Sequence, residues 1–345
     1  MSVLREVMGV RAFRSIEGVA ARTGRCLPCS RSCSVGRRGD GDFAKPAARA
    51  TLRCRAMSTS TVAPEAARTY RTVRHASGLR ISRCQCRAGV HDRPVDEEHS
   101  QFSITLVERG SFTYHTHAGS VQLRPGWLML GNAGQGYACS HEHSDGSGDD
   151  CATLSLSAQV LDDARSALAA ASAPTRFERA GLPPSPRVAA VMQSLAEQGD
   201  EGFALEEATF EVVAAIERAM RDGAAPGPAA AQDERARAAA DCIEARATDE
   251  LSLDEVARAA GLSAFHLLRV FRRSIGVTPH QYLMRVRLLR AMALLRDTAL
   301  PITAVAFDAG WADLANFNRA FRRELGCTPG AYRRGAMTPL RRRTD

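Results

Sequence analysis

The feature that most constrains the fold of this chain is an internal duplication close to its C-terminal end. The segment FRRSIGVTPHQY at 271–282 recurs as FRRELGCTPGAY at 321–332, at an offset of 50 residues. Upstream, the pairs VA and AG within 256–261 recur within 305–310, at an offset of 49 residues. Because so many matches keep the same order, we infer that one small folding unit is used twice.

Each copy has the pattern of a helix-turn-helix unit. A short helix ends at Gly261 in the first copy, and glycine can adopt the left-handed conformation that a tight turn between helices requires. Ser263 and Asp313 then supply side-chain oxygens that can cap the next helix of each copy. Small and apolar residues predict the buried faces, which comprise Val256, Ala257, Ala260, Leu267, Val270 and Phe271 in the first copy and Ala306, Ala309, Phe317, Ala320 and Phe321 in the second.

The opposite face of the second helix in each copy must meet solvent or DNA. Its side chains suit base reading, because Arg can bridge guanine O6 and N7, Asn can bridge adenine N6 and N7, and an exposed Leu or Phe can meet a thymine methyl. Arginines late in each helix suit phosphate contact better. Two alternatives stay open, in which His266 is a solvated helix residue and Leu268 packs against the following helix. The candidate DNA-binding residues are Phe265, His266, Leu268, Arg269, Arg272, Arg273, Ala315, Asn316, Asn318, Arg319, Arg322 and Arg323.

A connecting helix is predicted between the copies, over 281–296. Tyr282, Val286, Leu289 and the pair at 292–293 recur along one side of it at helical spacing. A rigid connecting helix would fix the separation of the two units. Equivalent major-groove positions on one face of B-DNA lie ~34 Å apart, so the pair can contact two successive grooves of a single site.

These residues resemble the AraC/XylS family of transcriptional regulators. The resemblance covers 233–334, and the segment GWADLANFNRAFRRELGCTPGAY at 310–332 looks like the family's C-terminal signature. It implies a seven-helix DNA-binding domain with two helix-turn-helix motifs, joined to a regulatory domain that binds an effector or dimerises. Implied partners are promoter DNA, RNA polymerase, a small-molecule effector and a second copy of the chain, in an activator. Trp311, where the family usually has Phe, is expected to pack, and Ala315 and Leu268 stand where relatives can carry polar base-contacting side chains.

Charge agrees with a polyanion partner for the C-terminal end. The chain has 46 basic and 38 acidic residues, a net charge of +8. Residues 58–232 carry 15 basic and 21 acidic residues, or −6, whereas 258–345 carry 16 basic and 5 acidic residues, or +11. Nucleic acid is the simplest partner for such a basic end, and a solvated basic face is the alternative.

The rest of the chain divides by composition into further segments. Residues 1–57 are predicted to be a disordered basic arm. The arm contains Cys26, Cys29, Cys33 and Cys54, whose spacing could in principle hold zinc. An alternative is that translation begins at Met57, so that the arm is not made. Short alternating runs punctuated by glycine predict β structure over 70–160. Two amphipathic helices for packing or dimerisation are predicted over 186–221, then a linker over 222–232, the DNA-binding domain over 233–334 and a basic tail over 335–345. The expected fold class is multidomain, with an all-β cupin-like domain and following helices before an all-α domain.

The β region resembles, more loosely, the cupin-like sensory domain common in this family. Within it, Cys139, His141 and His143 would lie on one face of a strand, and these ligand types suit zinc or another borderline metal. Cys84, Cys86 or Cys151 could complete such a set. The full cupin metal motif is absent, because no Glu follows His115 and His117 at the expected spacing. Metal sensing, redox sensing by thiols, a small organic ligand and pure dimerisation all remain open for this region.

The favoured hypothesis is therefore a sequence-specific transcriptional regulator, not an enzyme and without an obligatory cofactor. The alternatives are a cupin-type metal-dependent enzyme, a DNA-repair protein with an appended DNA-binding domain, and a bare architectural DNA binder. The sequence offers no convincing catalytic constellation and no phosphate-binding glycine loop followed by Lys. It also lacks a run of 18 apolar residues and a signal-peptide pattern, so we expect a cytoplasmic protein with no membrane partner.

Overall fold

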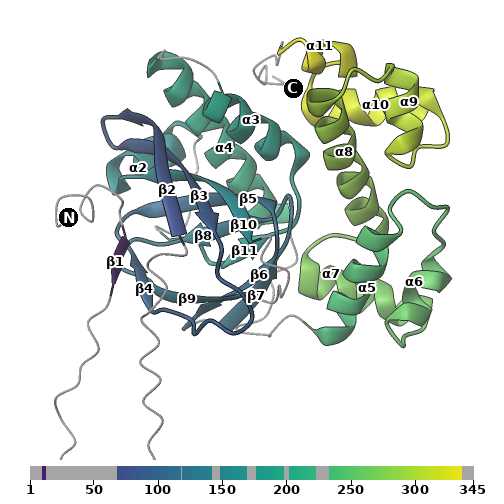
Figure 1. Ribbon diagram of the computed structural model, residues 1–345, viewed down its shortest axis with the longest axis horizontal. Coiled ribbons are helices and arrows are strands. Elements are labelled where there is room, and N and C mark those ends of the chain that lie inside the picture. Colours follow the sequence, from purple (N-terminus) through teal and green to yellow (C-terminus); the bar gives the residue numbers. More distant parts are fainter. Residues whose placement is uncertain are drawn as a thin grey trace, which may run out of the picture. The chain divides into compact units, whose positions relative to one another are not determined.

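The computed structural model of this chain describes residues 10–12, 68–117, 119–141, 148–168, 176–197, 202–222 and 233–335. An antiparallel β part with three helices comes first in the chain, and a part built only of helices follows it (Figure 1). Among the described helices, none combines the length and the apolar character needed to cross a bilayer.

The β part contains two antiparallel sheets. One has the strand order β1-β4-β9-β6-β7, and the other has the order β11-β8-β5-β10-β3-β2. The strands are β1 (Val10–Ala12), β2 (Arg68–Ala76), β3 (Leu79–Cys86), β4 (Glu97–His99), β5 (Phe102–Arg109), β6 (Phe112–Thr116), β7 (Gly119–Leu123), β8 (Leu128–Gly131), β9 (Gly136–His141), β10 (Asp149–Leu156) and β11 (Gly181–Leu182).

The central strands β5, β8 and β10 of the six-stranded sheet are largely buried on both faces, and residues that alternate along each strand face different surroundings. In β10, Ala152 and Leu154 are fully buried in an apolar cluster that includes residues of α3 (Pro186–Glu197). The alternate residues of β10, Cys151 and Thr153, line a cavity instead. One face of this sheet therefore supports an apolar core, and the other presents thiols and hydroxyls.

Helices cover the apolar face of this sheet. Besides α3, they are α2 (Ala158–Ala167) and α4 (Gly202–Asp222). Helix α3 packs against α4 and against strands β3 and β10, and α2 packs against α4 (Figure 1). Two of the three arise where the amphipathic pattern over 186–221 predicts helices.

The C-terminal part consists of seven described helices. Helix α8 contacts α5 and α7, which precede it in the chain, and α9 and α11, which follow it. It therefore connects two helical groups (Figure 1). The helices are α5 (Glu234–Ala245), α6 (Leu253–Ala259), α7 (Ala264–Ile275), α8 (Pro279–Asp297), α9 (Ile302–Asp308), α10 (Leu314–Leu325) and α11 (Pro329–Arg333).

Some boundaries differ from the expectation. The last long strand ends at Leu156 rather than near 160, because Ser157 caps α2 by accepting a hydrogen bond from the Val160 amide at 3.3 Å. The arm at 1–57 is not wholly without structure, since Val10–Ala12 pairs with β4, a strand that offers backbone groups for pairing. The remaining residues of that arm, the linker positions 223–232 and the tail after 335 lie outside the described residues.

Candidate functional site

The first pair of helices in the C-terminal part is α6 and α7, joined by a tight turn. Gly261 in this turn has a φ of 63°, in the left-handed region that favours glycine. Ser263 caps α7 by accepting a hydrogen bond from the His266 amide at 3.3 Å. Both features are as the sequence predicts.

The second pair, α9 and α10, repeats this arrangement. Gly310 has a φ of 89°, and a Cβ placed on it would lie 2.5 Å from the Ala247 carbonyl oxygen. Asp313 caps α10 more strongly than serine does in the first pair, because its carboxylate accepts from the amides of Ala315 and Asn316, each at 3.0 Å. These amide bonds lower the pKa of Asp313.

The apolar faces pack as expected from their spacing, with one exception. Every residue predicted to be buried in the two pairs is buried except Val270, which is half-buried. Trp311 is also buried, and its ring meets that of Phe317 edge-on with centroids 5.7 Å apart. The substitution of Trp for the usual Phe therefore occupies the interior of the helical group.

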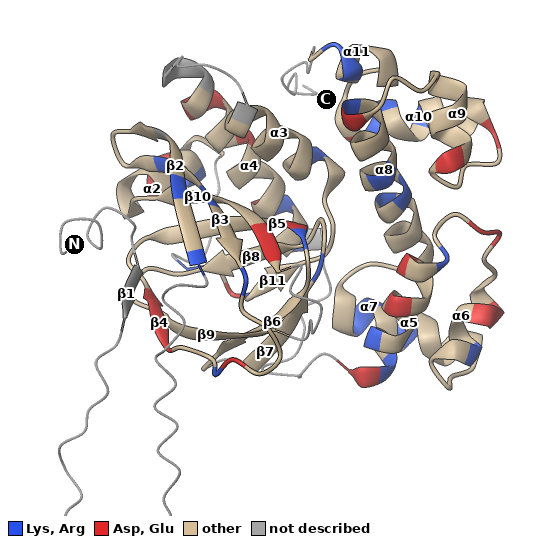
Figure 2. Ribbon diagram, in the orientation of Figure 1, with Lys and Arg blue, Asp and Glu red and all other residues tan. Residues whose placement is uncertain are grey.

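The predicted DNA-binding residues lie on the outer faces of α7 and α10. His266 and Asn318 are half-buried, and the other ten are exposed. Phe265 is 83% exposed and Leu268 is 39% exposed, so Leu268 does not find full cover against the following helix. Figure 2 shows basic residues on both helices, while acidic residues gather near α6 and α9. The two faces are thus solvent-accessible and basic.

Hydrogen bonding already organises one of these faces. The Arg319 guanidinium donates through Nη2 to the Asn316 side-chain oxygen, one turn earlier on α10. Asn316 thereby restricts the side-chain conformations of Arg319, which reduces the rotamer entropy that a contact with a ligand would cost.

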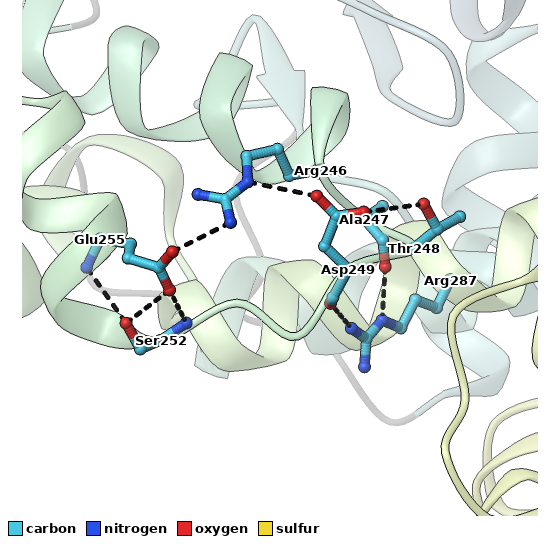
Figure 3. Close-up of polar contacts among 7 residues, drawn as sticks. All are labelled: Arg246, Ala247, Thr248, Asp249, Ser252, Glu255 and Arg287. Atoms are coloured by element: carbon cyan, nitrogen blue, oxygen red, sulfur yellow. Dashed lines mark hydrogen bonds and ion pairs between the residues drawn. The ribbon is translucent and has the colours of Figure 1, made fainter.

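A polar cluster fixes the start of α6, and its residues are drawn in Figure 3. Ser252 and Glu255 form a capping box, in which the Glu255 carboxylate accepts from the Ser252 amide at 2.9 Å. Arg246 bridges this box to Asp249, with nitrogen–oxygen distances of 2.9 Å to Glu255 and 3.3 Å to Asp249. The bonds from Ser252 and Arg246 lower the pKa of Glu255 to about 2.

The same cluster ties the α5–α6 loop to the connecting helix. Arg287 of α8 donates to the carbonyl oxygens of Ala247 at 2.7 Å and Asp249 at 2.8 Å (Figure 3). The loop that precedes α6 is therefore anchored at its backbone by α8, and the orientation of the first helix pair depends on that anchor.

The predicted apolar stripe of α8 is wrong in part. Tyr282 and Met292 are buried as expected, but Val286 and Leu289 are only half-buried. The buried set of this helix also includes Leu283, Leu288, Ala291 and Leu295. Helix α8 packs against helices from both groups, so it buries more than one face and a single stripe cannot describe it.

The second candidate site is a cavity of about 100 Å³ in the β part. Its walls combine thiols, hydroxyls and aromatic rings with one guanidinium, that of Arg68. Arg68 forms an ion pair with Glu97, which compensates its charge. The cysteines that line the cavity are Cys84, Cys86, Cys139 and Cys151.

Three side chains from three strands meet at this cavity. Cys86 of β3 and His141 of β9 approach to 3.6 Å between Sγ and Nε2, and the other ring nitrogen of His141 is 2.6 Å from the Asp149 Oδ2. All three are buried. Of the predicted ligand set, Cys139 and His141 line the cavity, whereas His143 lies outside the described residues. Asp149 is the member of the cluster that the spacing of Cys139, His141 and His143 does not predict.

The ionisation of this cluster reflects burial opposed by hydrogen bonds. Burial lowers the pKa of His141, but its bonds to Asp149 and Cys86 outweigh that effect and raise the pKa to about 9. Burial is the largest single effect on Cys86 and raises its pKa, but the bond and charge of His141, the Ala88 amide and Arg68 together outweigh it, and the net pKa lies below that of a free thiol. By contrast, burial raises the pKa of Cys139 to about 12. The Cys86 thiol therefore ionises more easily than Cys139.

Other histidines of the β part serve as hydrogen-bonded structural residues. The ring of His99 bonds to Tyr114 at 2.8 Å and Ser103 at 3.1 Å, and burial lowers its pKa to about 4. His115 bonds to Ser120 and Ser140, both at 2.7 Å. Neither ring belongs to the Cys86 cluster.

Comparison with known proteins gives an independent finding for the C-terminal part. Residues 256–335 match a family model described as a helix-turn-helix domain. The HTH-type transcriptional activator RhaS of Escherichia coli is 38% identical over 93 residues, which are 27% of this chain and 34% of that protein. The HTH-type transcriptional regulator MtrA of Neisseria gonorrhoeae is 33% identical over 86 residues, 25% of this chain and 29% of that protein. The chain thus spans about a third of the length of the curated relatives it matches.

Two solved structures are among those to which the chain is similar in part. A transcriptional regulator of the AraC-type DNA-binding class from Chromobacterium violaceum is 28% identical, with a TM-score of 0.29, and the match covers 31% of this chain and 96% of that one. ToxT from Vibrio cholerae is 11% identical, with a TM-score of 0.31, over 78% of this chain and 98% of that one. The resemblance to AraC-type regulators is confirmed by the helix-turn-helix match and by the relatives in sequence, which are named as transcriptional regulators and not as enzymes.

Proposed function

We propose that this protein is a sequence-specific, DNA-binding transcriptional regulator of the AraC/XylS type. The observation that carries the proposal is the pair of exposed basic faces on α7 and α10, each on the helix that follows a tight glycine turn. In this proposal, the pairs α6–α7 and α9–α10 are two helix-turn-helix units, and α7 and α10 are their recognition helices. The helix-turn-helix match over 256–335 supports this assignment.

Each face offers two kinds of DNA contact. Arg269 and Arg319 project from the first half of their helices and would read base edges in the major groove. The arginines at 272–273 and 322–323 come in the last turns and would neutralise phosphates, which supplies affinity without sequence information. Phe265 would contribute an apolar contact to a thymine methyl.

The β part would be the regulatory domain, of cupin-like architecture, and its cavity would receive the effector. Support comes from the thiol- and hydroxyl-lined space between two facing sheets, which an apolar core alone would not require. A homodimer, RNA polymerase as partner and a cytoplasmic location belong to the same proposal, and the resemblance over 233–334 supports them.

The experiment is selection of bound sites from random DNA by the full chain, followed by competition mobility shifts at ~150 mM salt. The regulator hypothesis predicts a consensus and much tighter binding to it than to random DNA, by a ratio typically of 10³ or more. Equal affinity for both would refute it in favour of a bare architectural binder, since phosphate contacts carry no sequence information.

A matched pair of variants connects that outcome to the proposed faces. The double variant Arg269→Ala and Arg319→Ala should lose the preference for the selected site. The double variant Arg218→Ala and Arg235→Ala removes two exposed positive charges from α4 and α5, outside the proposed interface, and should retain the preference. If both variants lose the preference for the selected site equally, the effect is due to the overall positive charge and not to the proposed faces.

A further inference from the structure

The cluster of Cys86, His141 and Asp149 has the composition of a metal site. One potential ligand atom from each residue lies within 4.8 Å of the other two, and the described part of the chain holds no second group of this kind. The residues come from β3, β9 and β10, so both sheets contribute. The cluster is therefore a product of the tertiary fold and not of one local motif.

Strand pairing explains why the side chains converge. Cys86 and Asp149 are direct partners in the β3–β10 ladder, which places their side chains on the same face of one sheet. His141 pairs with Phe112 in the β6–β9 ladder of the other sheet, and it reaches the cavity from the opposite side. The site is consequently held by regular backbone on every side, as a preorganised ligand set needs to be.

Asp149 is only 1% exposed, and one of its carboxylate oxygens is satisfied while the other is not. Its Oδ2 lies 2.6 Å from the Nδ1 of His141, but its Oδ1 is buried without a hydrogen-bond partner. A buried polar atom without a partner is unfavourable. A coordinated water molecule or an ion at the cavity would supply the missing interaction.

We propose that this cavity binds a zinc-class divalent ion through the Sγ of Cys86 and the Nε2 of His141. Zinc bonds of about 2.3 Å to sulfur and about 2.0 Å to nitrogen at the tetrahedral angle place the two ligand atoms about 3.5 Å apart. The observed separation is 3.6 Å. The two side chains thus already span one edge of a coordination tetrahedron.

Asp149 completes the arrangement as a positioning residue. By accepting from the Nδ1–H of His141, it orients the ring so that Nε2 can bind an ion once the ion displaces the proton shared with Cys86. Cys139 lines the same cavity and lies two residues before His141 on β9, but it stands outside the group of ligand atoms that lie within 4.8 Å of one another. Arg68 also contacts the Cys86 thiol, which favours the thiolate that an ion needs, and the pairing of Arg68 with Glu97 offsets its charge.

This inference deepens the proposed function, on which it rests for its biological meaning, because the ion would be the input that the regulator senses. Thiolate and imidazole ligands favour zinc and similar borderline ions over magnesium or calcium, which take oxygen ligands. The chemical class of the effector would then be a thiophilic divalent cation.

The test is titration of the full-length, metal-stripped and reduced chain with Co²⁺ alone. Binding by Cys86 and His141 predicts visible ligand-field bands of tetrahedral intensity and a near-ultraviolet thiolate-to-cobalt charge-transfer band, both abolished by added Zn²⁺. Cys86→Ser should remove most of the charge-transfer intensity. Cys242→Ser alters a half-buried thiol of α5 outside the cavity and should leave both bands unchanged.

Asp149→Asn provides a second variant that keeps the shape of the side chain. It should weaken Co²⁺ binding by roughly 10- to 100-fold while the bands keep their positions, because it affects the orientation of His141 and not the ligand set. A wild-type chain that gives no bands overturns the proposal, and so does a Cys86→Ser chain that gives the same bands as wild type.

The readout separates this inference from the proposed function, because cobalt spectra do not involve DNA. Mobility shifts of the selected site by both the metal-free and the Zn²⁺-loaded chain test the regulator hypothesis, because specific binding in either state supports it. If the bands appear and no site is selected, the metal site stands and the proposed function fails. If a site is selected and no bands appear, the proposed function stands and the metal site fails.

Discussion

Arg319 is the residue at which base reading can be examined most directly. It is exposed on α10, and Asn316 on the same face holds its guanidinium by a hydrogen bond. Arg319→Ala should cost about 1 to 3 kcal/mol of binding free energy on the selected site and relax the preference at one base pair. Competition binding against a set of single-base variants of the site measures both effects.

Arg323→Ala is the control for that substitution. It lies one turn later on α10, where phosphate contact is expected, and it should weaken binding to all sequences equally. It should also reduce the slope of log K against log salt by about 0.9 for the phosphate it no longer neutralises. If Arg319→Ala also weakens binding to all sequences equally, Arg319 contacts a phosphate and not a base.

Glu255 provides a prediction about pH. Its folded pKa of about 2 is below the ordinary value of 4.5, so its stabilising contribution is complete above about pH 4.5 and is lost as the pH falls towards 2. Glu255→Gln should therefore lower the melting temperature at pH 7, and the gap from wild type should narrow steadily between pH 4.5 and 2. Thermal unfolding followed by circular dichroism at several pH values measures this gap, and a gap independent of pH would show that the carboxylate charge is not what stabilises the cap.

At the level of elements, the two turn glycines have the same conformation and different surroundings. Both have positive φ, but a Cβ on Gly310 would clash with the backbone of Ala247, whereas one on Gly261 would meet nothing within 4 Å. Alanine at either position should cost about 1 to 2 kcal/mol for the left-handed backbone. Gly310→Ala should cost more than Gly261→Ala, because a backbone oxygen cannot move aside cheaply. Denaturant unfolding of the two variants compares these costs, and equal losses would contradict the close approach.

The helix pairs were predictable from sequence because their determinants are local. A glycine, a cap residue two or three positions later and apolar residues at helical spacing lie within about twenty residues of one another, and the duplication repeats the pattern. The multi-sided burial of α8 was not predictable, since Val286 and Leu288 are distinguished only by which neighbours pack around the helix.

The cluster of Cys86, His141 and Asp149 depends on long-range strand pairing, so sequence predicts it only in part. Cys139 and His141 share a face of one strand, and alternation predicts that much. Asp149 joins them only through the register of β3 with β10, which pairs it with Cys86 across more than sixty positions of sequence. Strand register is set by long-range pairing, so no local spacing identifies this residue. The alternation of apolar and polar residues from Ala152 to Leu156 predicts the strand but does not reach Asp149.

At the level of the whole molecule, α8 determines how the two proposed reading helices can use DNA. It is a single helix of 19 residues, about 28 Å long at 1.5 Å per residue. Equivalent positions in successive major grooves are ~34 Å apart. A continuous helix cannot lengthen, so the spacing between the two half-sites of the selected DNA should be fixed.

Insertion of base pairs between the half-sites tests that rigidity. Five base pairs rotate one half-site to the opposite face of the duplex, and ten restore the face but add a full turn of distance. Because α8 can follow neither change, both insertions should reduce affinity by roughly 5- to 150-fold, the equivalent of losing at least one bidentate base contact. Competition mobility shifts at ~150 mM salt provide the measurement. Retained affinity after the ten-base-pair insertion would mean that the two helix pairs move independently, and that α8 is not the element that sets their spacing.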